Sequence, residues 1–579
     1  MGEDHKIGFK KGALPMPLSA PPTVHTQPIG CAPILRHYFE RCHIVEIIDQ
    51  QVPRDPRRTE LTHGQACIAM MTGIFHQVFQ LYNIRKFATD SDILQALFPE
   101  IAPEAYFDDR LADTLDALYD SGIGNLELLL TRHMLTEFNI DTSVCHNDTT
   151  TASVYGNCDN HRTDSGITLS FGYSKKHRAD LKQLVWSLSV SSDSSFPLFQ
   201  QAYDGNTADV ETSLEQWQHL IELLGRQDFL YVADSKLLSK ENMAYIHDHE
   251  GFFLAPAPMY ASYRAVFDTA LTTHSSEQLI PYKDRGNRGF EVPLTFSHNE
   301  QEYVFRMLIL YAEKLFARKQ QSLFKRIDHT KAAFKKLSAK LNRYRLKTSE
   351  AIDKACQAIL TKYQTTDFFA YTIINEPIVT YKQATRGRPA RGREQEKVRI
   401  VTDQFRVELS TNEPAIDNAL LQCGYYPLIT NKSKAELSLA EAMLAHKDQY
   451  KPEHTHRRSK SGYRLEPIYL HIPERIEVFL FLFKVVLQLL VLMERTARNN
   501  ITRRDKGIDN FRPNRQDVRN PTAEYLLKEF QYIVKVSMTL PDHSQHIVVS
   551  DLTEVQQDIL SLLEVPLDCF TARYLFHSG

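Results

Sequence analysis

The spacing of apolar and polar positions divides the chain into a helical first part and a mixed middle part. Residues 1–33 are rich in proline and polar side chains, and we predict a disordered or extended leader there. Apolar residues then recur at helical spacing from Ile34 to Asn139, and the pattern predicts helices over 64–82, 91–98, 108–119 and 124–138. A DNA-binding module and a packing or dimerisation domain are both compatible with these helices.

The middle part alternates between strand-like and helix-like segments. Strands are predicted around Val144, over 167–171 and over 184–190, followed by a helix over 210–224. The uncharged run from Phe229 to Ala233 has the length of a buried strand and ends in Asp234, after which Ser239 is suited to begin a helix. Elements that alternate in this way predict a mixed α/β sheet.

A second acid stands at a comparable place in the first of these strands. Residues 140–148 alternate as in a strand, which we expect to end at Asp148, before Thr149, Thr150 and Thr151. A long helical stretch is predicted over 299–364. It combines an apolar stripe with twelve cations, which suit either a DNA backbone or a second subunit, although a solvated helical hairpin without a partner is also possible.

The remainder of the chain is predicted to return to strands over 398–430 and then to close with helices. The apolar stretch 478–493 is about 16 residues long and contains Lys484 and Gln488. Since a membrane span needs about 20 residues, we predict a buried core helix. Further helices are expected over 521–537 and 552–563, the latter with a cap at Thr553.

Composition adds bounds on size, partners and compartment. With 579 residues, of which 42% are hydrophobic, the chain can form two to four domains. A net charge of −3 gives no global signature of nucleic-acid binding, so DNA contacts would depend on local basic patches. The eight cysteines form no CxxC pair, and no signal peptide is visible, so we expect free thiols and a cytoplasmic protein.

The candidate chemistry lies in three acids far apart in the chain. Asp148 and Asp234 come from strands, whereas Glu453 and Lys460 are seven residues apart, which places them on one face of a helix. Carboxylates from two strands and one helix suit two divalent cations that act on a phosphodiester. Each acid taken alone is more commonly a turn or cap residue.

Six sequence pieces around these acids occur in a characteristic order. They are HNDTTTASVYG around Asp148, GYSKKHRADLKQ at 172–183, YDGNTAD at 203–209, YVADSKLLSKEN around Asp234, GYYPLITN at 424–431, and EHTHRRSK followed by LEPIYLHIPERIE. From about residue 35 to residue 565 the chain thereby resembles the DDE transposases of bacterial insertion sequences. Within them it is similar to the subgroup whose last acid lies in a Tyr-x2-Arg-x3-Glu-x6-Lys signature.

This resemblance implies an α/β fold with an RNase H-like mixed sheet flanked by helices. It implies a leader (1–33), a helical N-terminal domain (34–139), the first part of the catalytic domain (140–255), and a large insertion with the long basic helix (256–430). The catalytic helix and a core helix would follow (431–510), and then a C-terminal helical region (511–579). The expected activity is metal-dependent DNA cleavage and strand transfer, with two Mg²⁺ ions, for which Mn²⁺ can substitute. The expected partners are double-stranded DNA at the element ends and at the target, and a second copy of the chain in a synaptic homodimer, with no membrane.

The resemblance also implies roles for individual residues. Asp148, Asp234 and Glu453 would hold the metal ions, and Lys460 would contact the phosphate. The Tyr and Arg positions of the signature are occupied here by His446 and Gln449, so Arg457 or Arg458 would have to supply the positive charge that is lost. Further candidates for DNA contact form two basic clusters, one with Lys175, Lys176 and Arg178 and the other with Arg386 and Arg388.

Two other functions remain open on the sequence. A transposase-derived protein that recognises element ends without cutting would explain the substitutions at His446 and Gln449. A structural scaffold built on the helix of 299–364 would dimerise without any dependence on metal, but it would leave the acids at the strand ends without a role.

Overall fold

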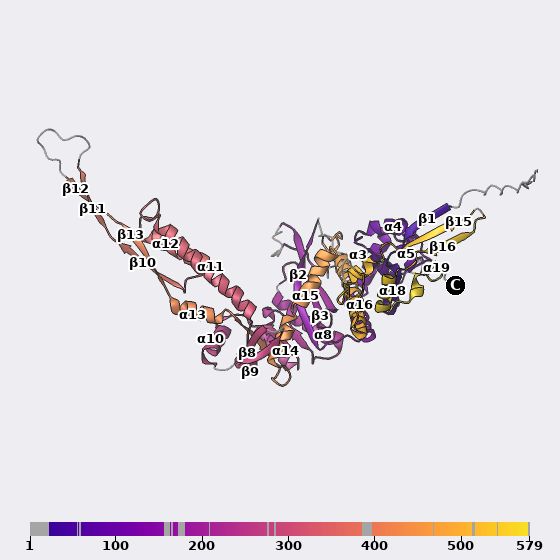
Figure 1. Cartoon of the computed structure of the whole chain (residues 1–579), viewed down its shortest axis with the longest axis horizontal. Helices are drawn as coiled ribbons and strands as arrows, with labels where there is room; N and C mark the ends of the chain where they lie inside the picture. Colours follow the sequence, from indigo (N-terminus) through magenta and orange to yellow (C-terminus); the bar gives the residue numbers. More distant parts are fainter. Residues whose placement is uncertain are drawn as a thin grey trace, which may run out of the picture. The chain divides into compact units, whose positions relative to one another are not determined.

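The computed structural model describes residues 23–54, 56, 60–155, 162–163, 166–171, 180–207, 209–274, 277–282, 285–384, 397–466, 468–511, 516–540 and 542–576. The chain forms two compact units (Figure 1). Unit 1 comprises residues 1–253 and 445–579, and unit 2 comprises residues 254–444. The three candidate acids all belong to unit 1.

Unit 1 begins with a short strand and a group of helices. These are β1 (Thr23–Pro28), α1 (Ala32–Arg41), α2 (Ile44–Gln51), α3 (His63–Phe75), α4 (Leu81–Asp90), α5 (Ile93–Leu97), the 3-10 turn η1 (Pro103–Ala105), α6 (Asp108–Asp120) and α7 (Ile123–Glu137). The single helix expected over 64–82 is wrong, because α3 ends at Phe75. Gln77 adopts a left-handed φ of 60°, and the Val78 N–H donates to the Gly73 carbonyl at 2.8 Å, which terminates the helix.

A mixed sheet follows, as the alternating pattern predicted. Its strands in unit 1 are β2 (Val144–Val154), β3 (Lys182–Ser191), β4 (Pro197–Tyr203) and β5 (Leu230–Val232), in the order β4-β3-β2-β5. β3 is antiparallel to both β2 and β4, whereas β5 is parallel to β2. Helix α8 (Asp209–Leu224) precedes β5, and the 3-10 turn η2 (Ser235–Leu237) and helix α9 (Lys240–Asp248) follow it. Ser239 caps α9 as expected, since its side chain accepts from the Asn242 N–H.

Two details of this sheet differ from the sequence prediction. β2 does not end at Asp148 but continues through Val154, because Thr149 to Val154 pair with β3 as far as Lys182. The expected strand at 167–171 is reduced to an isolated bridge between Ser170 and Gln183.

The second part of unit 1 is organised around a long buried helix. This second part begins with the last three residues of helix α14 (Leu439–Lys447), whose first six residues belong to unit 2. Helix α15 (Tyr450–Arg457) and a π-helical turn, η3 (Arg458–Gly462), then lead to α16 (Pro473–Arg504). By length and composition α16 is apolar enough to cross a membrane, but 94% of its most apolar window is buried inside the protein. The predicted core helix is therefore confirmed. Its Lys484 forms an ion pair of 3.1 Å with Glu127 of α7, and both side chains are buried.

The end of the chain is not purely helical, contrary to expectation. Helix α17 (Ala523–Lys528) is followed by β15 (Val534–Thr539) and β16 (Gln545–Val549), and then by α18 (Glu554–Leu563), the 3-10 turn η4 (Leu567–Phe570) and α19 (Ala572–Phe576). β15 pairs with β16 and also with β1, with Thr23 opposite Thr539. Residues 534–537 are therefore a strand, because the N-terminal segment supplies the backbone partner. The predicted cap of α18 is confirmed as a capping box between Thr553 and Gln556.

The described part of unit 2 combines a meander of strands with several helices and two ribbons. Residues 254–256 of β6 (Phe252–Pro256) pair with β14 (Tyr425–Thr430), and the order continues as β14-β9-β8-β7. The other strands of this sheet are β7 (Gln278–Tyr282), β8 (Arg285–His298) and β9 (Gln301–Tyr311). The ribbons pair β10 (Phe369–Asn375) with β13 (Phe405–Thr411), and β11 (Ile378–Gln383) with β12 (Lys397–Thr402). The helices of this unit are α10 (Ala261–Thr273), α11 (Glu313–Ser338), α12 (Ser349–Tyr363) and α13 (Glu413–Gln422).

The continuous helix expected over 299–364 is also wrong in its first part. Asn299 and Glu300 form a turn with φ of 47° and 64°, and β9 then alternates buried and exposed residues along its first half. The helical part begins only at Glu313, and α11 and α12 are separate helices.

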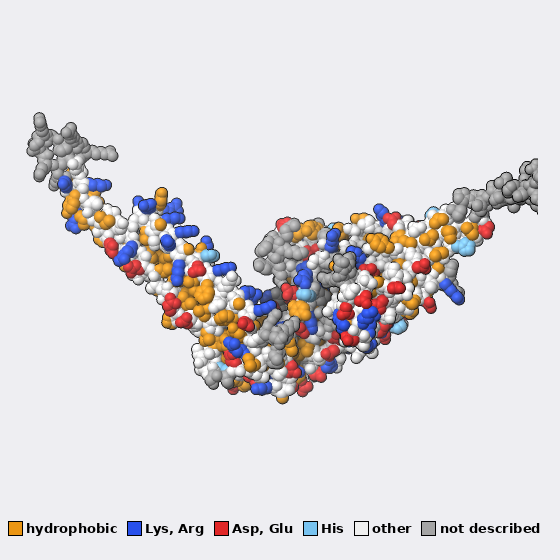
Figure 2. Space-filling view, in the orientation of Figure 1, with side chains coloured by type: hydrophobic (Ala, Val, Ile, Leu, Met, Phe, Trp, Pro, Cys, Tyr) orange, Lys and Arg blue, Asp and Glu red, His pale blue; other side chains and the backbone are white. Residues whose placement is uncertain are grey.

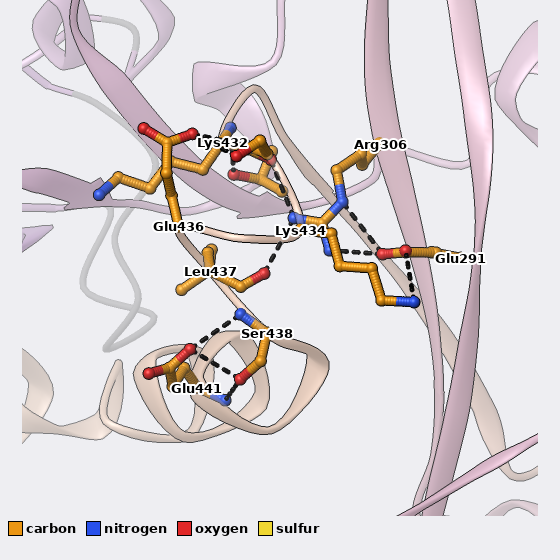
Figure 3. A network of polar contacts seen from close by, with 10 residues as sticks. Glu291, Arg306, Lys432, Lys434, Glu436, Leu437, Ser438 and Glu441 are labelled. Atoms are coloured by element: carbon orange, nitrogen blue, oxygen red, sulfur yellow. Dashed lines mark hydrogen bonds and ion pairs between the residues drawn. The ribbon is translucent and has the colours of Figure 1, made fainter.

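A polar network orders the loop that follows β14 (Figure 3). Arg306 of β9 pairs with Glu291 of β8 and donates to the carbonyls of Lys432 and Leu437, both at 2.9 Å. Next in the chain, Ser438 and Glu441 form reciprocal hydrogen bonds at the start of α14. The chain therefore enters α14 from a loop whose backbone is held by side chains.

Candidate functional site

Asp148 and Asp234 occupy matching positions on two neighbouring parallel strands. The register of β2 and β5 runs from Val144 opposite Leu230 to His146 opposite Val232. Asp148 lies two residues further along β2, and Asp234 lies two residues after the end of β5, with an extended backbone of φ −76° and ψ 177°. Neighbouring strands are about 4.8 Å apart and side chains alternate with a period of two, so a register continued by two residues would direct both carboxylates to the same face.

Each aspartate is also held locally. The Asp234 carboxylate accepts from the Lys236 N–H at 2.9 Å and caps the turn η2, so its side chain is at the start of a short helix. The Asp148 carboxylate accepts from the Thr149 N–H at 2.9 Å. Asp148 is half-buried in the middle of β2, and Asp234 is exposed after the end of β5, so neither carboxylate lies within the core.

Helix α15 is joined to β2 beside Asp148 by three side chains. Gln449 donates from Nε2 to the Asn147 carbonyl at 2.7 Å, and His456 Nε2 lies 3.2 Å from the Asp148 carbonyl. Beyond the helix, Lys460 donates to Thr150 Oγ1 at 2.6 Å and to the Thr151 carbonyl at 2.5 Å. The helix and the turn η3 therefore follow β2 from Asn147 to Thr151.

Glu453 lies on this same stretch of helix. Its position is four residues after Gln449 and three before His456, so helical geometry places it on the side of α15 that contacts β2. The side chain is exposed, and within the part of the chain that the structure describes its carboxylate forms no hydrogen bond or ion pair. The structure therefore brings Glu453 and Lys460 to the strand that carries Asp148.

The donor set has the chemistry of a site for a hard cation. Among the described residues, no group of three His, Cys, Asp or Glu side chains is placed to hold one metal ion. Aspartate carboxylates are the ligand type that Mg²⁺ takes, one or two at a time, while water and phosphate oxygens complete its octahedron.

Gln449 replaces an expected charge with a structural contact. Its Oε1 lies 3.1 Å from His146 Nδ1, while His146 Nε2 lies 2.9 Å from Ser192 Oγ. Burial lowers the pKa of His146 to about 4, so the imidazole is neutral at neutral pH. Because an amide oxygen can only accept, the proton must be on Nδ1, and Ser192 then donates to Nε2.

The other signature positions carry little free charge. Burial lowers the pKa of His446 to about 4, so this side chain is neutral as well. Arg458 is half-buried and forms ion pairs of 2.7 Å with Glu494 and Glu524; desolvation lowers its pKa, but the two carboxylates outweigh that effect and hold the pKa above its ordinary value. Arg458 therefore joins η3 to α16 and α17.

Arg457 remains available at the surface of α15. It is exposed, and its Nη2 lies 3.1 Å from His454 Nε2. Both residues line a cleft of about 470 Å³ in unit 1, together with Tyr450, Ser461 and Arg498. Arg457 and Arg458 both line this cleft. Within the described residues Arg458 is paired with two carboxylates, whereas Arg457 forms no ion pair with a carboxylate.

The basic clusters named from the sequence have no structural account. Lys175, Lys176, Arg178, Arg386 and Arg388 lie outside the described residues. The contacts of His146, His456 and Thr150 were not foreseen from the sequence. The spacing of Gln449, Glu453, His456 and Lys460, which follows one face of a helix, is the signal that would have indicated them.

Comparisons with known proteins give limited information. A family model described as a domain of unknown function, DUF4277, matches residues 24–130, which is the stretch from β1 into α7. No curated protein matches the chain. Among solved structures, a chain of the piggyBac transposase synaptic complex with hairpin DNA, determined by cryo-EM, matches with 8% identity and a TM-score of 0.26. That match covers 48% of this chain and 57% of the other, so it spans little more than half of the relative's length. A TM-score this low establishes no shared fold, and neither match names an activity that can be carried to this chain.

Proposed function

We propose that the chain is a DNA transposase whose RNase H-like unit 1 cleaves DNA and transfers the strand with the help of Mg²⁺. The observation that supports this most directly is the register of β2 and β5. The last pair of that register is His146 with Val232, and Asp148 and Asp234 each follow two residues later, while Gln449, His456 and Lys460 join the segment of Glu453 to β2. Acids from two neighbouring strands and a helix packed on them are the arrangement that the resemblance to the DDE transposases implies.

In this proposal Asp148 and Asp234 hold the cation, for which Mn²⁺ can substitute, and Glu453 completes the site from the helix. When bound, the cation lowers the pKa of a water or hydroxyl nucleophile and neutralises charge on the leaving oxygen. Lys460 orients the phosphate, because its ammonium is placed along β2 by Thr150 and Thr151. Arg457 supplies the positive charge that Gln449 and neutral His446 do not.

The substrate in this proposal is double-stranded DNA, at the ends of an element and at the target. Two ends require two active sites, so we propose a synaptic homodimer.

A cleavage assay with a matched control tests the assignment. Asp234→Asn removes one candidate ligand, and Asp228→Asn changes an exposed aspartate just before β5 whose ion pair in the described structure is with Arg226. We expect Asp234→Asn to lower excision of an element from a plasmid in Mg²⁺ at least a hundred-fold, which corresponds to about 2.7 kcal/mol in the barrier. Asp228→Asn should retain the wild-type rate. Equal excision by both variants would show that Asp234 is not part of the active site.

A second readout does not depend on activity. Binding of Mn²⁺ can be followed by electron paramagnetic resonance of the free ion. Asp148→Asn and Asp234→Asn should each weaken Mn²⁺ binding, and Asp228→Asn should not. Unchanged Mn²⁺ binding in both site variants would contradict the metal assignment even if excision were lost.

A second candidate function is favoured by the state of Gln449. Both ends of its amide are engaged by His146 and Asn147, so the position that carries arginine in the signature contributes no charge. A transposase-derived protein that binds element ends without cutting would have no need of that charge. Such a protein would bind end DNA equally well as wild type and as Asp234→Asn, and neither form would excise the element.

A further inference from the structure

Helix α11 of unit 2 has one face committed to its own core. Its buried residues Leu323, Ile327, Phe334 and Leu337 recur at helical spacing. They form a cluster with Ile352, Cys356 and Leu360 of α12, and with Phe369 and Phe405 of the β10–β13 ribbon. The orientation of α11 about its axis is therefore fixed by packing, and the opposite side faces solvent.

The solvent side is strongly basic in a chain whose net charge is −3. From Glu313 to Thr348, twelve lysines and arginines stand against two acids, Glu313 and Asp328. Eleven of the twelve are exposed; the other, Arg326, is half-buried near the Phe368 ring. Figure 2 shows Lys and Arg side chains along this part of unit 2.

Three of these cations form a regular row. Lys314, Lys325 and Lys336 follow one another at intervals of 11 residues, and Arg318 lies one turn after Lys314, whereas Lys340 follows the end of α11 at Ser338. Eleven residues make slightly more than three helical turns, so the row is nearly straight and advances by about 16.5 Å per step. It lies on the side of α11 opposite Leu323 and Phe334. Within the described residues, none of these five cations forms an ion pair.

The spacing and the charge indicate the partner. A line along the surface of a DNA duplex crosses one phosphate backbone or the other about every 17 Å, which is half of the ~34 Å helical turn. Two copies of α11 would repel each other through these faces. An amphipathic helix inserts into a membrane through its apolar face, and that face of α11 is already buried.

We propose that the row of Lys314, Lys325 and Lys336 binds the phosphate backbone of duplex DNA, independently of sequence and apart from the cleavage site of unit 1. The proposal rests on the proposed function only for the choice of DNA as the polyanion. The geometry itself comes from α11.

Salt dependence of binding tests this surface on the full-length protein. The stripe variant carries Lys314→Gln, Lys325→Gln and Lys336→Gln. The control variant carries Lys331→Gln and Lys335→Gln on α11 and Lys354→Gln on α12, which are also exposed and remove the same charge off the row. Affinity for a 40-base-pair duplex of random sequence is measured by fluorescence anisotropy at several salt concentrations.

Each lost phosphate contact should reduce the slope of log affinity against log salt by about 0.9. We expect the stripe variant to lose about 2.7 in slope, so that affinity falls about 40-fold less than in wild type between 50 and 200 mM salt. The control variant should change the slope by less than about 0.9, the amount expected for one phosphate contact. An equal change in both variants, or none in either, would overturn the proposal.

Two further arms separate partner and fold. Binding to phosphatidylserine vesicles and to a single-stranded RNA is measured in the same way. If the stripe variant loses salt slope with either of these ligands but not with the duplex, the choice of DNA is overturned. If the stripe variant loses helical circular dichroism, a photoreactive label on Lys325→Cys should crosslink to the duplex whereas one on Lys354→Cys should not, with the unsubstituted protein as the labelling control. The Asp234→Asn variant should keep the full slope. A wild-type protein that shows this slope but does not excise the element would disprove the proposed function and leave the present proposal standing.

Discussion

The attachment of α15 to β2 through Gln449 can be tested by replacing it with methionine. Methionine has a similar length but can neither donate to the Asn147 carbonyl nor accept from His146 Nδ1. His146 and Asn147 are 0% and 4% exposed, so water cannot easily take the place of the lost amide. At about 1.5 kcal/mol for each buried group left without a partner, the substitution should cost about 3 kcal/mol of local stability.

Hydrogen exchange followed by mass spectrometry measures that local stability. A loss of about 3 kcal/mol in the opening free energy of α15 should accelerate exchange of its amides about a hundred-fold. Gln218→Met is the matched control, because this glutamine is exposed on α8 and makes one hydrogen bond, to the Tyr245 hydroxyl at 3.0 Å. The reasoning is refuted if α15 exchanges less than tenfold faster, or if the control accelerates α15 equally.

Three further predictions concern unit 1, whose unfolding can be followed alone by fluorescence because both tryptophans, Trp186 and Trp217, belong to it. Lys484→Met should lower the free energy of unfolding by about 3 to 5 kcal/mol, since it leaves Glu127 buried without its cation, and adding Glu127→Gln should restore most of the loss. Burial raises the pKa of Glu477 to about 7. The folded pKa of Glu477 thus lies above its unfolded value. The contribution of the protonated carboxyl to the free energy of unfolding is therefore complete below about pH 4.5 and is lost as the pH rises through 7. Over that pH range the free energy of unfolding of the wild type should fall by at most about 3 kcal/mol relative to that of Glu477→Gln. If the free energies of unfolding of the two proteins change in parallel with pH, the raised pKa is contradicted. Thr553→Ala should cost about 1 kcal/mol through loss of the capping box of α18, and an unchanged urea midpoint would contradict it.

Several elements could be predicted from the sequence because their causes are local. The run before Asp234 is apolar over five residues and then turns polar, which is enough to indicate a buried strand with an acid at its end. Ser239 and Thr553 cap their helices by accepting from the backbone N–H three residues later. Helix α16 could be predicted from its composition, because its long run of apolar residues is typical of a buried helix.

Other features depended on partners that lie far along the chain. β2 continues past Asp148 because β3 supplies its backbone hydrogen bonds, and β15 exists because β1 lies beside it from the other end of the protein. From the sequence, Gln449 could be interpreted only as the loss of a positive charge. In the structure its amide contacts buried His146 and the Asn147 carbonyl of β2. The sequence by itself determined which residues can be buried, capped or charged. Only the tertiary structure decided which of them meet, because backbone pairing and side-chain contacts across hundreds of residues leave no periodic trace in the sequence.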